Sequence, residues 1–225
     1  MIEITNKSKF IALLADINNQ PVPKVDCDIL ALKFDENIEN STTQLKKMLP
    51  EINTPLMICG CGKEETDAIL LPELINLLDR QCIISYITEK TYKKILPPVI
   101  KGGHYAVLKT PIDISLAKEL NILSINLGLG KDKIIMNTDI GALGYGYEYG
   151  YSMIEKTRLE NDEYLNFPIL SEAPLESLKT KEAKESVNKA KMIEITSAAG
   201  VIAAGANIVV TANSEIINTL RKIIL

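Results

Sequence analysis

Short apolar runs recur along this chain at nearly regular intervals, and helical patterns separate most of them. Their apolar character is continuous rather than alternating, which is typical of parallel strands covered on both faces. We expect eight strands, at Phe10–Leu14, Ile29–Phe34, Leu56–Gly60, Cys82–Ile87, Tyr105–Leu108, Lys133–Met136, Pro168–Leu170 and Ile208–Thr211. Eight strands alternating with helices predict an α/β fold, a (β/α)8 TIM-type barrel, formed by residues 1–225 as one domain.

The clearest helix is predicted over Asp113–Leu127, where leucines repeat at helical spacing and Asp113 can act as the N-cap. The other expected helices are Thr42–Leu49, Leu71–Leu78 with Pro72 in its first turn, Met153–Tyr164, Lys179–Ala204 with a break near Gly200, and Ser214–Leu225 capped by Ser214. These segments supply most of the crossovers that a parallel barrel requires.

The first crossover is incomplete in the sequence. Between Leu14 and Ile29, Pro21 and Pro23 leave no room for a full helix. Either the first helix is absent, or the first strand does not belong to the barrel. The alternative architecture is an open, doubly wound sheet of six or seven strands.

The charge balance and hydropathy exclude several classes of protein. A formal charge of −4 and a pI near 5.3 argue against nucleic-acid binding, which needs a basic face. No apolar run reaches the roughly 18 residues of a membrane span. The first residues also lack the basic start and apolar core of a signal peptide, so we expect a cytoplasmic protein.

Metal binding through cysteine or histidine is not expected. The four cysteines form no Cys-x-x-Cys pair, and the spacing of Cys59 and Cys61 is poor for a metal or a cluster. The single histidine, His104, leaves no second imidazole. Because His104 precedes its strand, we expect it at the N-terminal face of the barrel in a structural role.

Residues 140–155 interleave glycines with tyrosines at a strand-to-helix turn. The glycines are Gly141, Gly144, Gly146 and Gly150, and the tyrosines are Tyr145, Tyr147, Tyr149 and Tyr151. Glycine allows close approach of the backbone to a ligand, and tyrosine offers a rigid face. The segment therefore predicts a surface for a planar ligand or a partner protein. The alternative is a tight turn leading into a helix with tyrosines packed beneath it.

Active sites of such barrels lie at the C-terminal ends of the strands, where this sequence is polar and rich in glycine. The candidate cofactor-binding residues there are Cys61, Thr110, Asn137, Asp139, Gly141, Gly144, Tyr145, Gly146, Glu148 and Asn213. Several have structural alternatives: Asn137 and Asp139 can form turns, and Glu148 suits a helix start. No residue is predicted to be catalytic, because the acid–base groups offered are Asp139, Glu148 and Glu172, without a histidine.

Several segments, from about residue 55 to the C-terminus, together resemble one family. They are Gly60-Cys61-Gly62 with Asp67, Asp113 to Asn121, Gly141 to Tyr149, Met153 to Arg158, Glu194-Ile195-Thr196, and Ala204 to Asn207. In this order they are similar to the small (delta) subunit of the corrinoid iron–sulfur protein, part of the acetyl-CoA decarbonylase/synthase system.

The resemblance implies a barrel related to pterin-binding methyltransferases. It implies a heterodimer with a large corrinoid subunit that carries a [4Fe–4S] cluster and a cobalamin domain. The barrel top would help to enclose cobalamin while a methyl group passes from methyltetrahydrofolate to cobalt and on to acetyl-CoA synthase. The chain would be a non-catalytic subunit of that complex, with the large subunit, a methyltransferase and acetyl-CoA synthase as partners.

The sequence departs from the family pattern at the proposed top. The family's Asp-Pro-Thr-Thr is replaced by Asn137-Thr-Asp139-Ile140, and the chain has no tryptophan. Two other functions therefore stay open. One is a stand-alone methyltransferase-like barrel that binds a pterin or another small molecule, and the other is a diverged paralogue with a structural or interaction role.

Overall fold

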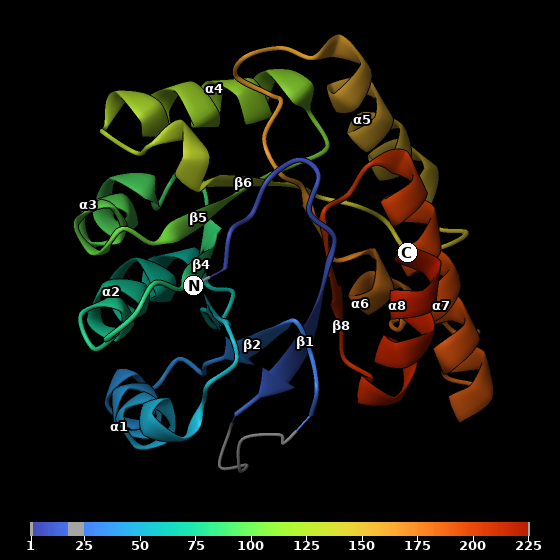
Figure 1. Cartoon of the computed structure of the whole chain (residues 1–225), viewed down its shortest axis with the longest axis horizontal. Coiled ribbons are helices and arrows are strands. Elements are labelled where there is room, and N and C mark those ends of the chain that lie inside the picture. Colours follow the sequence, from blue (N-terminus) through green and yellow to red (C-terminus); the bar gives the residue numbers. More distant parts are fainter. Residues whose placement is uncertain (1, 18–24, 225) are drawn as a thin grey trace.

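The computed structural model describes residues 2–17 and 25–224, and within these ranges eight parallel strands form a nearly closed barrel surrounded by helices (Figure 1). The strands are β1 (Phe10–Asp16), β2 (Ile29–Lys33), β3 (Leu56–Cys59), β4 (Ile83–Ile87), β5 (Tyr105–Thr110), β6 (Ile134–Thr138), β7 (Leu170–Ser171) and β8 (Ile208–Thr211). The predicted barrel is confirmed, and each predicted strand position overlaps an observed one.

The strands are hydrogen-bonded in the order β6-β5-β4-β3-β2-β1-β8-β7, so β1 lies between β2 and β8. This placement rules out the alternative in which the first strand lies outside the barrel. The barrel closes between β6 and β7 through a short stretch of backbone pairing. Met136 forms a parallel bridge with Ile169, and its amide donates to the Pro168 carbonyl at 2.7 Å. The seam between β6 and β7 is therefore the least extensively paired part of the wall.

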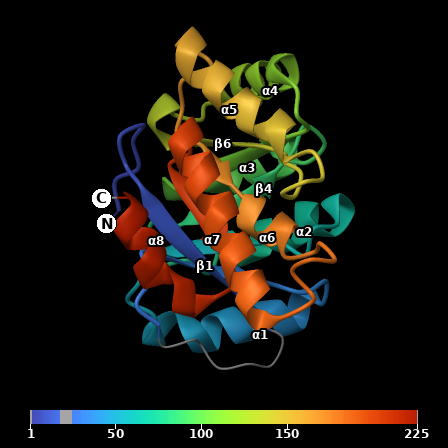
Figure 2. The ribbon, with the colours of Figure 1, turned by 90° about the vertical axis from the view of Figure 1, so that its right-hand side faces the viewer.

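Helices cover the outside of the strands, and Figure 2 shows α5 to α8 side by side over one flank. The helices are α1 (Ile38–Met48), α2 (Glu64–Ile75), α3 (Tyr92–Gly102), α4 (Ile114–Asn126), α5 (Tyr147–Glu160), α6 (Ala173–Ser177), α7 (Val187–Ala204) and α8 (Ile217–Ile224). Most of the expected first crossover, residues 18–24, lies outside the described residues. Residues 25–28 enter β2 without a helix.

Alternating side chains along each strand produce two apolar cores. One fills the barrel, and its members include Ala31, Met57, Val107, Ile135 and Val210. The other lies between the strands and the helices, and its members include Leu32, Ile58, Ile84, Leu74 and Val201. Strands buried on both faces explain why their sequences read as continuous apolar runs.

The predicted helix starts are partly confirmed. Asp113 caps α4, and its carboxylate accepts from the amides of Ser115 and Leu116 at 2.8 and 3.0 Å. Ser214 is not the cap that we expected: Asn213 accepts from Glu215 N at 3.0 Å and begins a short 3₁₀ turn, Ser214–Ile216, before α8. An amide oxygen one residue earlier therefore performs the capping.

Two predictions about helix breakers were wrong. Pro72 lies inside α2, which already begins at Glu64. Its missing amide is tolerated because Leu70, Leu71 and Leu74 are all buried there. The chain also continues as α7 through Gly200, where a Cβ atom would clash with the Tyr147 hydroxyl. This glycine serves close packing of α5 on α7 rather than helix termination.

A helix that the sequence did not suggest, α3, contains Pro97 and Pro98. It has a strongly amphipathic face, on which Ile95, Leu96 and Val99 are buried. Burial of this face outweighs the propensity penalty that the two prolines impose.

His104 lies at the N-terminal end of β5, as predicted. It is buried, and its Nδ1 atom accepts from the Cys82 amide at 3.1 Å. Burial lowers the pKa of this imidazole.

Residues 141–151 follow the C-terminal end of β6, on the same face as residues 60–62 after β3, in agreement with the prediction. Within the described part of the chain, no helix combines the length and the apolarity that crossing a membrane requires.

Candidate functional site at the barrel mouth

Polar side chains replace the apolar interior at the C-terminal ends of several strands. Glu172, directly after β7, is the centre of this cluster. Its Oε2 atom accepts from Lys109 Nζ at 2.9 Å and from Asn137 Nδ2 at 3.1 Å. The Asn137 side chain is almost fully buried, so the amide is fixed in this position. Three strands, β5, β6 and β7, thus contribute to one charged hydrogen-bond network.

Lys109 connects this network to its surroundings. Its Nζ atom lies 3.9 Å from Asp139 Oδ1 and 4.7 Å from the centre of the Tyr86 ring. Burial by itself would lower the pKa of Lys109, but the Glu172 carboxylate and then Asp139 outweigh it and raise that pKa. Lys109 therefore remains an ammonium group at neutral pH.

Two further titratable side chains of the inner mouth, Tyr86 and Cys59, are also held in their protonated forms. Burial, followed by the nearby Glu172 charge, raises the pKa of Tyr86 well above its ordinary value. Burial raises the pKa of Cys59 to about 12, although the Ser85 hydroxyl donates to its sulfur at 3.2 Å. Neither the Tyr86 phenol nor the Cys59 thiol therefore ionises near neutral pH.

A cavity of about 770 Å³ opens above this cluster. Its wall includes Leu14, Lys33, Cys59, Tyr86 and Glu172. Lys33 ends β2 and is exposed at the mouth, and among the described residues its amine has no ion pair. The volume lies in the range of small-molecule sites, roughly 300–1,000 Å³.

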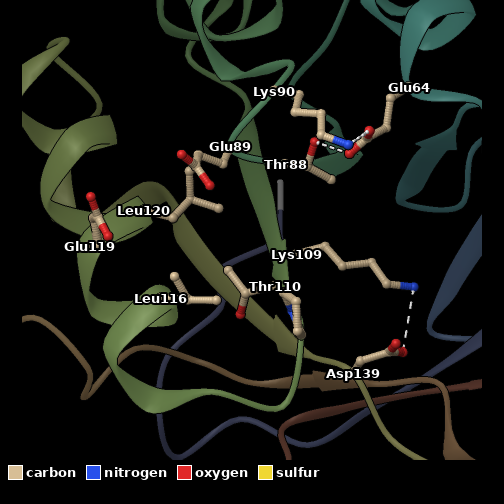
Figure 3. A pocket seen from close by; sticks show the side chains of 11 residues that line it. Glu64, Thr88, Glu89, Lys90, Lys109, Thr110, Leu116, Glu119, Leu120 and Asp139 are labelled. Atoms are coloured by element: carbon tan, nitrogen blue, oxygen red, sulfur yellow. Dashed lines mark hydrogen bonds and ion pairs between the residues drawn. The ribbon is translucent and has the colours of Figure 1, made fainter.

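A second compartment of about 340 Å³ lies beside the first, and we call it the side pocket (Figure 3). It is bounded by the segments after β4 and β5 and by the start of α4. Its lining residues are Glu64, Thr88, Glu89, Lys90, Lys109, Thr110, Pro111, Leu116, Glu119, Leu120 and Asp139. Three of them, Glu64, Thr88 and Lys109, also line the larger cavity, so the two compartments form one mouth.

The predicted site residues divide into those that the fold brings to this mouth and those that it uses elsewhere. Asn137 belongs to the Glu172 network, and Asp139 and Thr110 line the side pocket. Asn213 caps the turn before α8, and Glu148 lies exposed in the first turn of α5. Their observed positions suit structural roles, and ligand contacts of these residues stay a prediction.

Cys61 lies in a turn that Asp67 holds closed. The carboxylate of Asp67 accepts from Cys61 N at 2.7 Å and from Gly62 N at 2.9 Å. A side chain at Gly60 would clash with this carboxylate. Burial raises the pKa of the Cys61 thiol, so the turn does not activate it. The glycines and Asp67 therefore shape the rim of the mouth.

The glycine–tyrosine segment forms the tight turn with a packed tyrosine that the sequence allowed, and its role as a surface for a ligand or a partner stays a prediction. Gly144 and Gly146 adopt φ values of +78° and +91°, which favour glycine, and space is open around Gly144. Gly141 instead packs against the segment's own backbone. Tyr147 is packed, and its hydroxyl donates to the Ser197 carbonyl at 2.9 Å.

Two tyrosines of this segment remain available to a ligand or a partner. Tyr145 is 56% exposed, and Tyr149 is 66% exposed. The Tyr145 hydroxyl lies 3.3 Å from the Glu182 carboxylate, which anchors its tip. Both rings lie where the segment leads into α5, on the mouth side of the barrel.

Sequence reasoning missed Lys33, Tyr86 and Lys109. Lys109 occupies the third position of an inward-facing series in β5 that begins with Tyr105 and Val107. A lysine at the end of an otherwise apolar strand was the available signal, because its charge cannot lie between the sheet and the helices. Tyr86 gave no such signal, since tyrosine is common in buried strands.

Comparison with known proteins places this barrel in a family. The profile of the family described as CO dehydrogenase/acetyl-CoA synthase delta subunit matches residues 3–225. The chain belongs to this family.

Curated relatives are also described as delta subunits. The chain is 28% identical over 142 residues to the acetyl-CoA decarbonylase/synthase complex subunit delta of Methanopyrus kandleri, covering 61% of this chain and 36% of the relative. It is 30% identical over 133 residues to the delta subunit of Archaeoglobus fulgidus, covering 56% of this chain and 29% of the relative. The match thus spans about a third of the length of these relatives.

Solved structures with the same fold are dihydropteroate synthases. The Yersinia pestis enzyme superposes with a TM-score of 0.74 at 10% identity, covering 97% of this chain and 92% of that chain. The Coxiella burnetii enzyme in complex with pteroic acid gives 0.67 at 13% identity, covering 96% and 91%. At these identities the likeness establishes a TIM-barrel fold for this delta-subunit family member and nothing further.

Three of the segments that resemble the delta-subunit family have structural explanations here. Asp67 closes the Gly60–Gly62 turn, as described above. Arg158 donates to the carbonyls of Phe167 and Gly205 at 2.9 and 3.1 Å. Asn207, which follows the Gly205 turn, donates to the Ser8 carbonyl at 2.9 Å. These residues join the N-terminal segment to β8 at the face opposite the mouth.

Proposed function

We propose that this chain is a barrel subunit of an acetyl-CoA decarbonylase/synthase system whose mouth, together with a large corrinoid subunit, encloses cobalamin during methyl transfer. The observation that carries the proposal is the rim of exposed apolar side chains around the mouth. Ile112, Leu116, Tyr145, Tyr149 and Val187 are exposed, and each lies in or just before the first turn of α4, α5 or α7.

Such a rim suits an interface. Aromatic side chains are enriched at the centres of protein interfaces, and exposed apolar patches mark docking sites. The helices α4, α5 and α7 that carry the rim begin at the C-terminal ends of β5 and β6 and after β7. A partner resting on this rim would cover both compartments of the mouth.

The residues of this chain suit a corrinoid that is shared with a partner subunit better than a corrinoid that this chain binds alone. When bound, the corrinoid supplies a cobalt that accepts and releases the methyl group. This chain supplies Tyr145, Tyr149 and the open turn at Gly144 as a contact surface. Its one histidine, His104, lies at the opposite face with its Nδ1 atom engaged. The chain therefore offers no imidazole to the cobalt, and the partner must provide half of the enclosure.

The test is a titration of purified chain with hydroxocobalamin, followed by its visible spectrum, with and without the cognate large subunit. We expect weak binding by the chain alone and stoichiometric binding by the pair. Tight binding by the isolated chain would reject the shared site. Failure of the two chains to associate would leave the diverged paralogue as the better description.

A matched pair of variants on one helix locates the docking surface. Tyr149→Ala removes a ring at the start of α5, and Leu159→Ala removes an 85% exposed side chain at the other end of the same helix. We expect the first to weaken association at least about tenfold and the second to leave it unchanged. Equal effects of both variants would contradict docking on the mouth.

A second candidate function is the binding of a pterin-like small molecule inside the larger cavity. The Glu172–Asn137–Lys109 network favours it, because fixed carboxylate and amide groups can recognise a heterocycle edge. Coxiella dihydropteroate synthase, with the same fold, was solved with pteroic acid. Calorimetric titration with pteroic acid tests this, with Glu172→Gln expected to abolish binding and Glu155→Gln, on the outer side of α5, expected to preserve it.

A further inference from the structure

A β-turn at the start of the glycine–tyrosine segment presents Tyr145. The Tyr145 amide donates to the Ala142 carbonyl at 2.8 Å, and Gly144, at the third position of the turn, has a φ of +78°. A positive φ at that position is typical of a type II turn and favours glycine. The turn's own hydrogen bond leaves the amide of its second residue, Leu143, without a partner. This amide therefore needs an acceptor from another part of the chain.

That acceptor is the hydroxyl of Ser177, the last residue of α6. The Ser177 Oγ atom accepts from the Leu143 amide at 3.2 Å, and the Ser177 residue is fully buried. A buried hydroxyl cannot exchange this bond for a bond to water, so breaking the bond would leave a polar group unsatisfied. Ser177 therefore fixes the backbone of the turn to the end of α6.

Residues 177–183, which we call the supporting segment, are themselves hydrogen-bonded into one shape. The Thr180 hydroxyl donates to the Ser177 carbonyl at 2.7 Å and accepts from the Ala183 amide at 3.3 Å. Thr180 and Ala183 are buried, and Glu182 between them is exposed. The Tyr145 hydroxyl donates to the Glu182 carboxylate, whose two oxygens lie 3.3 and 3.4 Å away. The supporting segment thus holds both the backbone of the turn and the tip of its tyrosine.

The two exposed tyrosines of the glycine–tyrosine segment differ in this respect. Tyr145 is 56% exposed although its tip is bonded, whereas Tyr149 is 66% exposed and its hydroxyl has no hydrogen bond among the described residues. The Glu182 carboxylate also raises the pKa of Tyr145, so this phenol stays a donor at neutral pH. A side chain that is ordered before binding loses less conformational entropy when a partner covers it.

We propose that Ser177 and Glu182 are positioning residues, which order the Tyr145 ring for the partner that docks on the mouth. Neither residue has to touch that partner. Ser177 acts through the Leu143 amide, and Glu182 acts through the Tyr145 hydroxyl. Tyr145, rather than the more exposed Tyr149, is then the contact that is ordered in advance. The inference rests on the proposed function, because it requires a partner chain to cover this rim.

The first measurement is ring order in the chain alone. Tyrosine labelled with ¹³C at its ring ε positions gives a relaxation rate for each ring, and Tyr145→Phe and Tyr149→Phe assign the two signals by their loss. We expect the Tyr145 ring to be more ordered than the Tyr149 ring in the wild type, and as mobile as it in Glu182→Ala. The control, Glu185→Ala, changes the charge equally and is expected to leave Tyr145 ordered. Equal mobility of the two rings in the wild type would overturn the inference.

The second measurement is association with the cognate large subunit. We expect Glu182→Ala to weaken association about threefold, because the Tyr145 ring must then be ordered on binding. Glu182→Gln keeps an acceptor oxygen and is expected to restore most of the affinity. In the Tyr145→Phe background, which lacks the hydroxyl, Glu182→Ala is expected to have no further effect. An equal loss in both backgrounds would show that Glu182 does not act through Tyr145.

Ser177→Ala tests the backbone contact. We expect it to weaken association about tenfold, because the Leu143 amide loses its acceptor and the whole turn is released. Urea unfolding measures its cost in stability separately, and the Glu182 variants test the same role at an exposed position. Wild-type chains that do not associate with the large subunit would reject the proposed function. Association that is unchanged in both Ser177→Ala and Glu182→Ala would reject only the positioning role.

Discussion

At the scale of single residues, the buried carboxylate of Asp67 holds the turn at the rim of the mouth. Asp67 satisfies two amides of the Gly60–Gly62 turn. We expect Asp67→Ala to destabilise the protein by about 2 kcal/mol, because two part-buried amides lose the acceptor that the buried Asp67 carboxylate provides. Asp113→Ala, which removes an exposed cap of α4, is expected to cost about 1 kcal/mol. Urea unfolding measures both, and a smaller loss for Asp67→Ala than for Asp113→Ala would refute this account of the turn.

Glu194, on α7, makes a second prediction at this scale. It is fully buried, it accepts from Thr211 Oγ1 and from Ala212 N, and its Oε2 atom has no partner among the described residues. Burial raises its pKa above 4.5. The folded state therefore favours the protonated form, and stability present below pH 4.5 is lost as pH rises through the folded-state pKa.

We expect Glu194→Gln to remove this pH dependence, since the amide stays neutral and keeps the acceptor atom. Melting temperatures measured from pH 4.5 to pH 8 should fall less in the variant than in the wild type. Parallel curves for the two proteins would show that the Glu194 carboxyl does not titrate differently in the folded and unfolded chain.

At the scale of elements, the contact between α5 and α7 depends on Gly200. Alanine in a helix interior normally stabilises by about 1 kcal/mol relative to glycine. Here a Cβ would clash with the Tyr147 hydroxyl and displace it from the Ser197 carbonyl. We expect Gly200→Ala alone to leave the stability of the protein unchanged. In the Tyr147→Phe background, the same substitution is expected to raise the stability by about 1 kcal/mol. A double-mutant cycle in urea measures this coupling, and additive effects would contradict it.

At the scale of the whole molecule, Arg158 joins the segments that precede β7, β8 and β1 at the face opposite the mouth. Its guanidinium bonds to the Phe167 carbonyl before β7, the Gly205 carbonyl before β8 and the side chain of Asn6. We expect Arg158→Lys to lose about 2–3 kcal/mol, because an ammonium cannot reach several acceptors in one plane. Hydrogen exchange should show the loss first at β7 and β8, and uniform loss across all strands would argue against a local role of Arg158.

The sequence by itself determined the barrel, because apolar runs at regular intervals allow few other parallel arrangements. It also determined the α4 cap and the N-terminal face for His104. Only the tertiary structure decided which polar side chains meet. Lys109, Asn137 and Glu172 are far apart in the chain and come together because three neighbouring strands end at one level. It also decided that Pro72 and Gly200 lie inside helices, because burial and packing outweigh local propensity there.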